Sequence, residues 1–432
     1  MKPMHAAPRH GRAVARKQES RSDFAPLWLM LAALCAVAAM SQSFRTVATL
    51  VANDLKAQFS FSEQELGLFA GAFHLSFALA QIPMGTFIDI YGPRRAISAA
   101  FLLAPLGALM SAFAPNLYVL VAGQLIIGVG CAPAFIGSLV FIANRYPAAQ
   151  FAPLSGLVLG LSGLGMLATG TPLAWVVENG SWRLAFLVLG LAAALALVAV
   201  FFIVEDDTRS VHGERGTLRQ AFSGIGPILV ERRTAGVLAC AFVAYASFIS
   251  LRGLWAVPML TDRAGLTVVE SGNVLMASSL AALLGPLAFG LLKLGDFARR
   301  SLIAVCLAAN AAVFAVLSLS SDASVDVALT IFLGSLTGYF ILQTDDVRAS
   351  YPESQAGRAL SVVNTISFLG VAAMQWLTGW TASIAVGRGI ASLTAAFGTI
   401  AVMLLLALIA FVLLPWPSQG RDKPGASKAL QP

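Results

Sequence analysis

Two arginines stand inside stretches that are otherwise apolar. Arg45 lies in "SQSFRTVATLVANDL" (41–55) and Arg252 in "YASFISLRGLWAVPMLTD" (245–262). A guanidinium stays charged, and placing it at the centre of a bilayer costs about 2.5 to 3.5 kcal/mol on insertion scales. Every Asp and Glu falls in a tail, a loop or a helix end, so the sequence offers no carboxylate at mid-depth. A planar five-donor group suits carboxylate or phosphate oxygens, and we expect each arginine to meet an anion brought in from outside. The alternative is a structural arginine that bonds helix carbonyl groups.

Other polar side chains share the predicted helices of these arginines or lie on later ones. Gln42 is within one turn of Arg45, and Tyr245 and Trp255 flank Arg252 at helical spacing. The candidates for the lining of a binding site are therefore Arg45, Arg252, Gln42, Tyr245, Trp255, Tyr339, Gln343 and Asn364. His74 is a candidate proton carrier because the ordinary pKa of histidine is near 6.5, although a lone helix histidine more often satisfies a structural hydrogen bond.

The composition indicates which elements hold these residues. Hydrophobic residues make up 58% of the 432, charged residues 11%, and the mean hydropathy is +0.80. That is too apolar for a soluble domain of this length. Apolar runs of about 20 residues, enough to cross a bilayer as a helix, occur about twelve times. The sequence predicts an all-α, multi-pass membrane protein.

The net charge of +7 is explained by topology and does not indicate a nucleic-acid partner. With the N-terminus inside the cell, the outer loops hold only Lys56, Arg183, Arg263 and Arg388, and Arg45 and Arg252 are the remaining cations outside the inner segments. The positive-inside rule then predicts a protein of the inner (plasma) membrane with both termini in the cytoplasm. The basic first segment lacks an apolar core and a cleavage site, so we interpret it as a cytoplasmic tail.

The chain repeats itself. Arg45 aligns with Arg252, and the spacing from Gly67 to Gly85 equals that from Gly272 to Gly290. This predicts a disordered basic tail (1–24), an N-terminal six-helix bundle (25–204), a cytoplasmic linker (205–233), a C-terminal six-helix bundle (234–415) and a second tail (416–432). Transporters built from such repeats bind substrate between the halves near the bilayer midplane.

The turn after the second predicted helix reads "GTFIDIYGPRR", with Gly85, Asp89, Gly92, Arg94 and Arg95 in the pattern Gly-x-x-x-Asp-x-x-Gly-x-Arg-Arg. Here the sequence resembles the major facilitator superfamily, whose fold is twelve transmembrane helices in two bundles. The resemblance implies that these five residues form a cytoplasmic gate. The equivalent turn "GLLKLGDFARR" (290–300) lacks the matching acid.

Arginines in helices one and seven resemble those of the organic-anion symporters and organophosphate antiporters of that superfamily. The resemblance implies a carrier that moves a small organic or phosphorylated anion by alternating access. Gln124 stands where many proton-coupled members have an arginine, so coupling stays open between protons, a counter-anion and neither. Two alternatives are an inorganic-anion carrier of the nitrate and nitrite type, whose paired arginines lie on helices two and eight, and a transporter-like sensor of an anion.

The sequence contains no nucleotide-binding loop, no catalytic constellation and no cysteine or histidine spacing typical of a metal site. We therefore expect no enzyme activity, cofactor or metal. The expected partners are a small anionic substrate and the lipid bilayer, with the chain acting as a monomer.

Overall fold

The computed structural model describes residues 24–205, 234–351 and 353–414. The described part is helical, and twelve of its helical segments are long and apolar enough to cross a membrane. The predicted all-α membrane fold is therefore confirmed. The tails and the linker of the predicted domain plan fall outside the described residues, apart from their edges.

The N-terminal half contains the helices α1 to α10. Their bounds are α1 Phe24–Thr46, α2 Ala48–Phe59, α3 Glu63–Tyr91, α4 Pro93–Phe101, α5 Leu103–Ala112, α6 Leu117–Cys131, α7 Pro133–Arg145, α8 Ala148–Ala168, α9 Thr171–Asn179 and α10 Trp182–Ile203. Short irregularities divide single spans, so that α4 with α5, α6 with α7, and α8 with α9 each form one crossing.

The C-terminal half repeats this arrangement. Its elements are α13 Ala235–Ser250, the π-helical turn η3 Leu251–Trp255, α14 Ala256–Asp262, α15 Val268–Gly290, α16 Asp296–Leu319, α17 Ala323–Leu336, the 3₁₀ turn η4 Thr337–Tyr339, α18 Phe340–Ser350, α19 Glu353–Val386 and α20 Ser392–Leu413. In this half α13, η3 and α14 form one crossing, as do α17, η4 and α18.

The same local chemistry starts the second crossing of each half. Ser62 caps α3 and forms a capping box with Glu65, and Thr267 forms the same box with Glu270 at α15. A capping box satisfies main-chain N–H groups that a helix start would leave without partners. The internal repeat seen in the sequence is thus also a repeat of structure.

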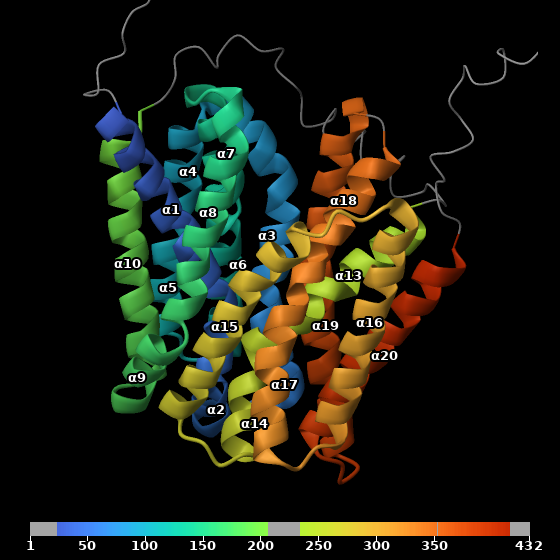
Figure 1. The fold of residues 1–432 in the computed structure, drawn as a ribbon. Coiled ribbons are helices and arrows are strands. Elements are labelled where there is room, and N and C mark those ends of the chain that lie inside the picture. Colours follow the sequence, from blue (N-terminus) through green and yellow to red (C-terminus); the bar gives the residue numbers. More distant parts are fainter. Residues whose placement is uncertain (1–23, 206–233, 352, 415–432) are drawn as a thin grey trace, which may run out of the picture.

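Each half has two ends. The linker end is defined as the end where α1 begins, α10 ends and α13 begins, and the far end is the opposite one. The halves meet at the far end, where α2 and α14 lie, and the ribbons diverge toward α7 and α18 (Figure 1). Hydrogen bonds across the far end run from Asn53 to Thr261 (2.8 Å) and from Thr171 to Asn273 (2.6 Å).

Glycines explain how closely the halves approach. A Cβ at Gly67 of α3 would lie 2.5 Å from the carbonyl oxygen of Gln375 in α19, and a Cβ at Gly272 of α15 would lie 2.7 Å from the Ala174 Cβ. Toward the linker end, a Cβ at Gly85, Gly160 or Gly290 would meet nothing within 4 Å. Small residues let helices pack main chain to main chain. The structure is thus closed at the far end.

Candidate functional site

Arg45 projects from the end of α1 toward the other half. Its Nη1 donates to Gln42 Oε1 (3.2 Å) and its Nη2 to Ser41 Oγ (3.4 Å), both on its own helix. The side chain is buried but keeps some contact with solvent, since the residue has an exposed fraction of 8%. Its hydrogen-bond acceptors within the described part of the chain are neutral oxygens. The positive charge is therefore held in place without being neutralised.

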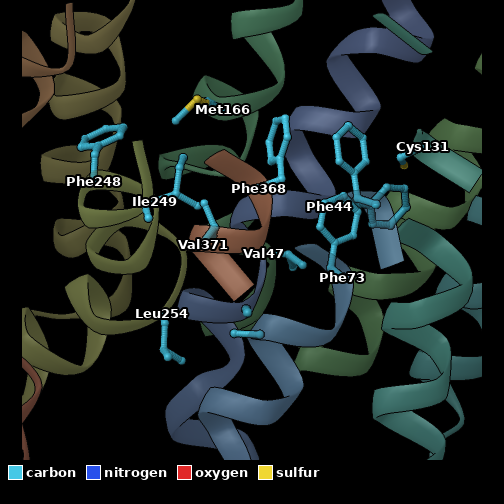
Figure 2. Packing of buried hydrophobic residues seen from close by; sticks show 14 of the residues in the cluster. Phe44, Val47, Phe73, Cys131, Met166, Phe248, Ile249, Leu254, Phe368 and Val371 are labelled. Atoms are coloured by element: carbon cyan, nitrogen blue, oxygen red, sulfur yellow. The ribbon is translucent and has the colours of Figure 1, made fainter. Parts of the chain in front are cut away.

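Two aromatic rings enclose this guanidinium. The Arg45 Cζ lies 4.4 Å from the ring centroid of Phe77 in α3 and 4.6 Å from that of Phe368 in α19. One ring comes from each half, and cation–π contacts of this kind strengthen where water is excluded. Tyr245 of α13 packs edge-on against Phe368 at 5.6 Å between ring centroids. Phe368 and Val371 join Phe44 of α1 and Val47, which lies between α1 and α2, in one core (Figure 2).

His74 and Gln375 lie beside Arg45. The ring of His74 makes one hydrogen bond, between Nδ1 and the carbonyl oxygen of Ala70 (3.3 Å), and its buried Nε2 makes none in the described structure. The Gln375 amide lies near the Arg45 main chain, since a Cβ at Gly253 would be 3.1 Å from the Arg45 carbonyl oxygen and 3.3 Å from Gln375 Nε2. His74 lies one helical turn before Phe77, whose ring contacts Arg45. The amide of Gln375 is fully buried, also without a hydrogen-bond partner among the described residues. These side chains bring polar groups of α1, α3 and α19 together.

Arg252 has a different environment. Its Nε donates to Ser279 Oγ (3.0 Å) on α15, within its own half. Its Nη2 crosses to the N-terminal half, where it donates to the carbonyl oxygens of Met166 (2.9 Å) and Thr169 (3.3 Å) and to Thr169 Oγ1 (3.3 Å). The residue has no exposed surface. Arg252 is therefore enclosed in this state, whereas Arg45 retains some exposure.

A hydroxyl group links the surroundings of the two arginines. Thr169 Oγ1 lies 2.6 Å from the Oγ1 of Thr46, the residue that follows Arg45 in the sequence. The same Thr169 oxygen accepts a hydrogen bond from Arg252 Nη2. A Cβ at Gly253 would lie 3.1 Å from the carbonyl oxygen of Arg45. The two arginine-bearing segments therefore lie close together, but the two guanidinium groups have different partners, and their binding of an anion stays a prediction.

The remaining candidates for the binding site lie either at the seam, which is the contact surface between the two halves, or inside the C-terminal bundle. Asn364 Nδ2 donates to Gln81 Oε1 (3.4 Å) across the seam. Trp255 Nε1 donates to Thr378 Oγ1 (2.9 Å), and Gln343 Nε2 donates to Cys240 Sγ (2.9 Å). Tyr339 is buried in η4. Substrate binding by these residues stays a prediction.

Comparison with known proteins identifies the family. The family described as Major Facilitator Superfamily matches residues 29–374. The chain belongs to the major facilitator superfamily.

Relatives and solved structures agree with this assignment. A probable sulfoacetate transporter of Cupriavidus necator is 22% identical over 350 residues, covering 76% of this chain and 80% of that protein. A hexuronate transporter of Bacillus subtilis is 22% identical over 378 residues, covering 83% and 90%. A thioclapurine efflux transporter of Claviceps purpurea is 25% identical over 195 residues, and the match spans only 35% of its length. A D-xylose-proton symporter structure has the same fold, with a TM-score of 0.71 at 17% identity over 91% of this chain and 99% of that one.

As a member of the major facilitator superfamily with transporter relatives, the chain is a transporter and not an enzyme. Its relatives imply a small substrate and a membrane environment. In the described residues, no group of three or more His, Cys, Asp or Glu side chains is placed to hold a metal ion.

The superfamily motif at the linker end has the expected local geometry. Gly92 has φ 83°, in the region that favours glycine, and ends α3 directly before Pro93 starts α4. Arg94 donates to the carbonyl oxygen of Phe201 in α10 through Nε (3.1 Å) and Nη2 (2.7 Å). Asp89 and Arg95 are exposed. If Asp89 acts as part of the gate, we expect it to face the start of α19 near Arg358, whose side chain lies outside the described residues, so the gate role stays a prediction.

In the second half the acid comes from a different helix. Asp346 of α18 is buried and pairs with Arg299 (3.0 Å) and Arg300 (3.3 Å) of the second motif. The sequence has no acid at Lys293 or Leu294, and the acid nearest to them, Asp296, also pairs with Arg299 (3.0 Å). The part played by Asp346 could not be predicted, because a carboxylate supplied from another helix leaves no trace in the spacing of the motif.

Sequence reasoning missed Phe77, Phe368, Ser279 and Thr169. Phenylalanine occurs 27 times in this chain, so a ring that stacks on an arginine has no signal that separates it from a packing residue. Thr169 follows a glycine-rich run and precedes Pro172, a pattern that marks a helix interruption but not a partner for Arg252.

Proposed function

We propose that this transporter moves a small organic or phosphorylated anion by alternating access, with Arg45 as the principal ligand of the anionic group. The observation that carries the proposal is the Arg45 guanidinium, buried at the seam between the halves and bonded only to neutral oxygens of its own helix. A cation in such a place is costly without an anion nearby. The substrate would supply that anion.

The shape of the arginine environment supports a carboxylate or phosphate. A guanidinium can donate two parallel hydrogen bonds to such a group, and Gln42 and Ser41 bind Arg45 only through long contacts of 3.2 and 3.4 Å. A charged acceptor forms shorter and stronger bonds, so an incoming anion competes well with these two side chains. Phe77 and Phe368 fix the plane of the guanidinium, which reduces the entropy lost on binding.

The charge distribution supports a location in the inner membrane with the linker end in the cytoplasm. The linker-end turns carry Arg94, Arg95, Arg145, Lys293, Arg299, Arg300 and Arg348, whereas the far-end loops carry Lys56, Arg183, Arg263 and Arg388. By the positive-inside rule the linker end faces the cytoplasm. The closed far end then makes this an outward-closed state, in which substrate exchanges with the cytoplasm.

Binding can be tested with matched probes. Purified protein is assayed by thermal shift with galacturonate, sulfoacetate and glycerol 3-phosphate, and with galactose as the neutral counterpart of galacturonate. We expect at least one anion to raise the melting temperature and galactose to have no effect. Equal stabilisation by galactose and galacturonate would overturn the anion proposal. Counterflow of the stabilising anion in proteoliposomes distinguishes a carrier from a sensor.

A further inference from the structure

The Arg252 guanidinium binds the carboxyl end of α8, a helix of the other half. Helix α8 ends at Ala168 and α9 begins at Thr171, so residues 166–170 hold the last residues of α8 and the two-residue interruption. In an uninterrupted helix the carbonyl group of Met166 would accept from the N–H of Gly170, but that N–H bonds the carbonyl oxygen of Leu167 instead (2.9 Å). The Met166 carbonyl oxygen thus lacks its intrahelical N–H partner; it accepts from Thr169 Oγ1 of its own half (3.0 Å) and from Arg252 Nη2 of the other half (2.9 Å).

The electrostatics of this contact are favourable. The carboxyl end of a helix carries a partial negative charge and presents carbonyl groups without intrahelical partners, so a cation there is stabilising. Arg252 supplies that cation from η3. Because α8 belongs to the N-terminal half and η3 to the C-terminal half, the cap can form only while the halves meet at the far end.

Arg252 lies in the π-helical turn η3, and the main-chain geometry of this turn directs its side chain toward the other half. In η3 the N–H of Ala256 bonds the carbonyl oxygen of Leu251, five residues back, and Pro258 has no N–H to donate. The N–H of Val257 then finds its partner across the seam, in Thr49 Oγ1 of α2 at 3.0 Å. The irregular turn therefore makes two sets of contacts with the opposite half, one through a side chain and one through the main chain.

We propose that Arg252 is a positioning residue that latches the far end closed, by capping α8 of the opposite half. In this state it does not touch substrate. Its side chain is fully enclosed, and its interhalf bonds, two of them to main-chain carbonyl oxygens, hold η3 against the interruption between α8 and α9. Opening of the far end breaks these bonds and uncovers the guanidinium.

The latch can be measured by distances between spin labels. One pair of labels reports the far end, at Ala57 and Ser321, and a second pair reports the linker end, at Ala149 and Ala298, all of them exposed positions. The native cysteines Cys35, Cys131, Cys240 and Cys306 are buried and so shielded from the label. We expect the parent protein, without ligand, to show mainly the short far-end distance.

Arg252→Gln should move at least half of the molecules to a longer far-end distance and shorten the linker-end distance. Ser279→Ala is the matched control, because it removes a bond of Arg252 within the same half and leaves the cap in place. It should keep the parent distribution. Since no ligand is present, the result does not depend on what the substrate is.

A parent-like far-end distribution in Arg252→Gln, or an equal shift in Ser279→Ala, would overturn the latch. If Arg252→Gln does not fold, Arg252→Lys replaces it, because lysine keeps the charge but its Nζ lies one bond short of the Nη2 that makes both carbonyl contacts. That variant should show an intermediate shift, and unchanged distances in it would also overturn the proposal.

Discussion

Arg45 and Arg252 show how far a residue type alone predicts a role. Both were found from the sequence, because a charge inside an apolar run is rare and costly. Their environments were not predictable. Arg252 bonds main-chain carbonyl oxygens, which every residue carries, and Arg45 lies between two rings that the sequence does not distinguish from other phenylalanines.

His74 is the residue on which proton coupling can be tested. It is enclosed, lies one helical turn before Phe77, whose ring contacts Arg45, and has one ring nitrogen without a hydrogen-bond partner in the described structure. If it carries the coupled proton, His74→Gln should abolish the dependence of uptake on an imposed pH gradient while substrate exchange continues. The measurement is proteoliposome uptake with and without the gradient. Full gradient dependence in the variant would remove His74 from the mechanism.

At the scale of the elements, the contact between α3 and α19 decides how tightly the far end closes. Gly67→Ala would place a methyl group 2.5 Å from the Gln375 carbonyl oxygen and 3.1 Å from the Gly379 Cα, where only main chain could yield. Overpacking of this kind costs about 1 to 3 kcal/mol. We expect a lower melting temperature for Gly67→Ala.

Gly160→Ala is the control for that substitution, since its added methyl group meets nothing within 4 Å. Alanine is the better helix former by about 1 kcal/mol, so the control should melt at the parent temperature or above. Equal losses of stability in the two variants would contradict the close packing of α3 on α19.

The α2 element carries a half-buried carboxylate near the far-end seam. Burial raises the pKa of Asp54 above its ordinary value of 3.8, so the charged form is disfavoured in the folded protein. The stabilising effect of a raised pKa is present at low pH and is lost as pH rises through that pKa. Asp54→Asn should therefore melt above the parent at neutral pH. The gain should vanish on acidification, and a gain independent of pH would contradict this assignment.

The elements themselves were predicted well because their signals are local. Long apolar runs and the turn motif from Gly85 to Arg95 mark the crossings in the sequence. The interruptions inside crossings were not predicted. The π-helical turn at 251–255 is followed by Val257, whose N–H bonds Thr49 Oγ1 in the other half, and a partner so distant in sequence leaves no local signal.

For the whole molecule, the structure is one state of a cycle. The far end is closed by glycine packing and by bonds between the halves, and Asp89 at the linker end is exposed. If Asp89 acts only when the linker end closes, Asp89→Asn should bind ligand with parent affinity and transport it several-fold more slowly. Binding by thermal shift and counterflow rates measure the two properties separately. Loss of ligand-induced stabilisation in a folded variant would show that the gate assignment is wrong.

The proposed transport of an anion depends above all on Arg45, which we propose binds the anionic group of the substrate. The most direct measurement is the affinity, by isothermal titration, of the anion that gives the largest thermal shift among galacturonate, sulfoacetate and glycerol 3-phosphate. Arg45→Gln should weaken it about tenfold or more, since a hydrogen bond to a charged group contributes about 1.5 to 3 kcal/mol. Arg45→Lys should recover part of the loss, because it keeps the charge without the two-pronged geometry, and Arg388→Gln in an exposed loop should bind like the parent. Parent affinity in a folded Arg45→Gln protein would contradict the account.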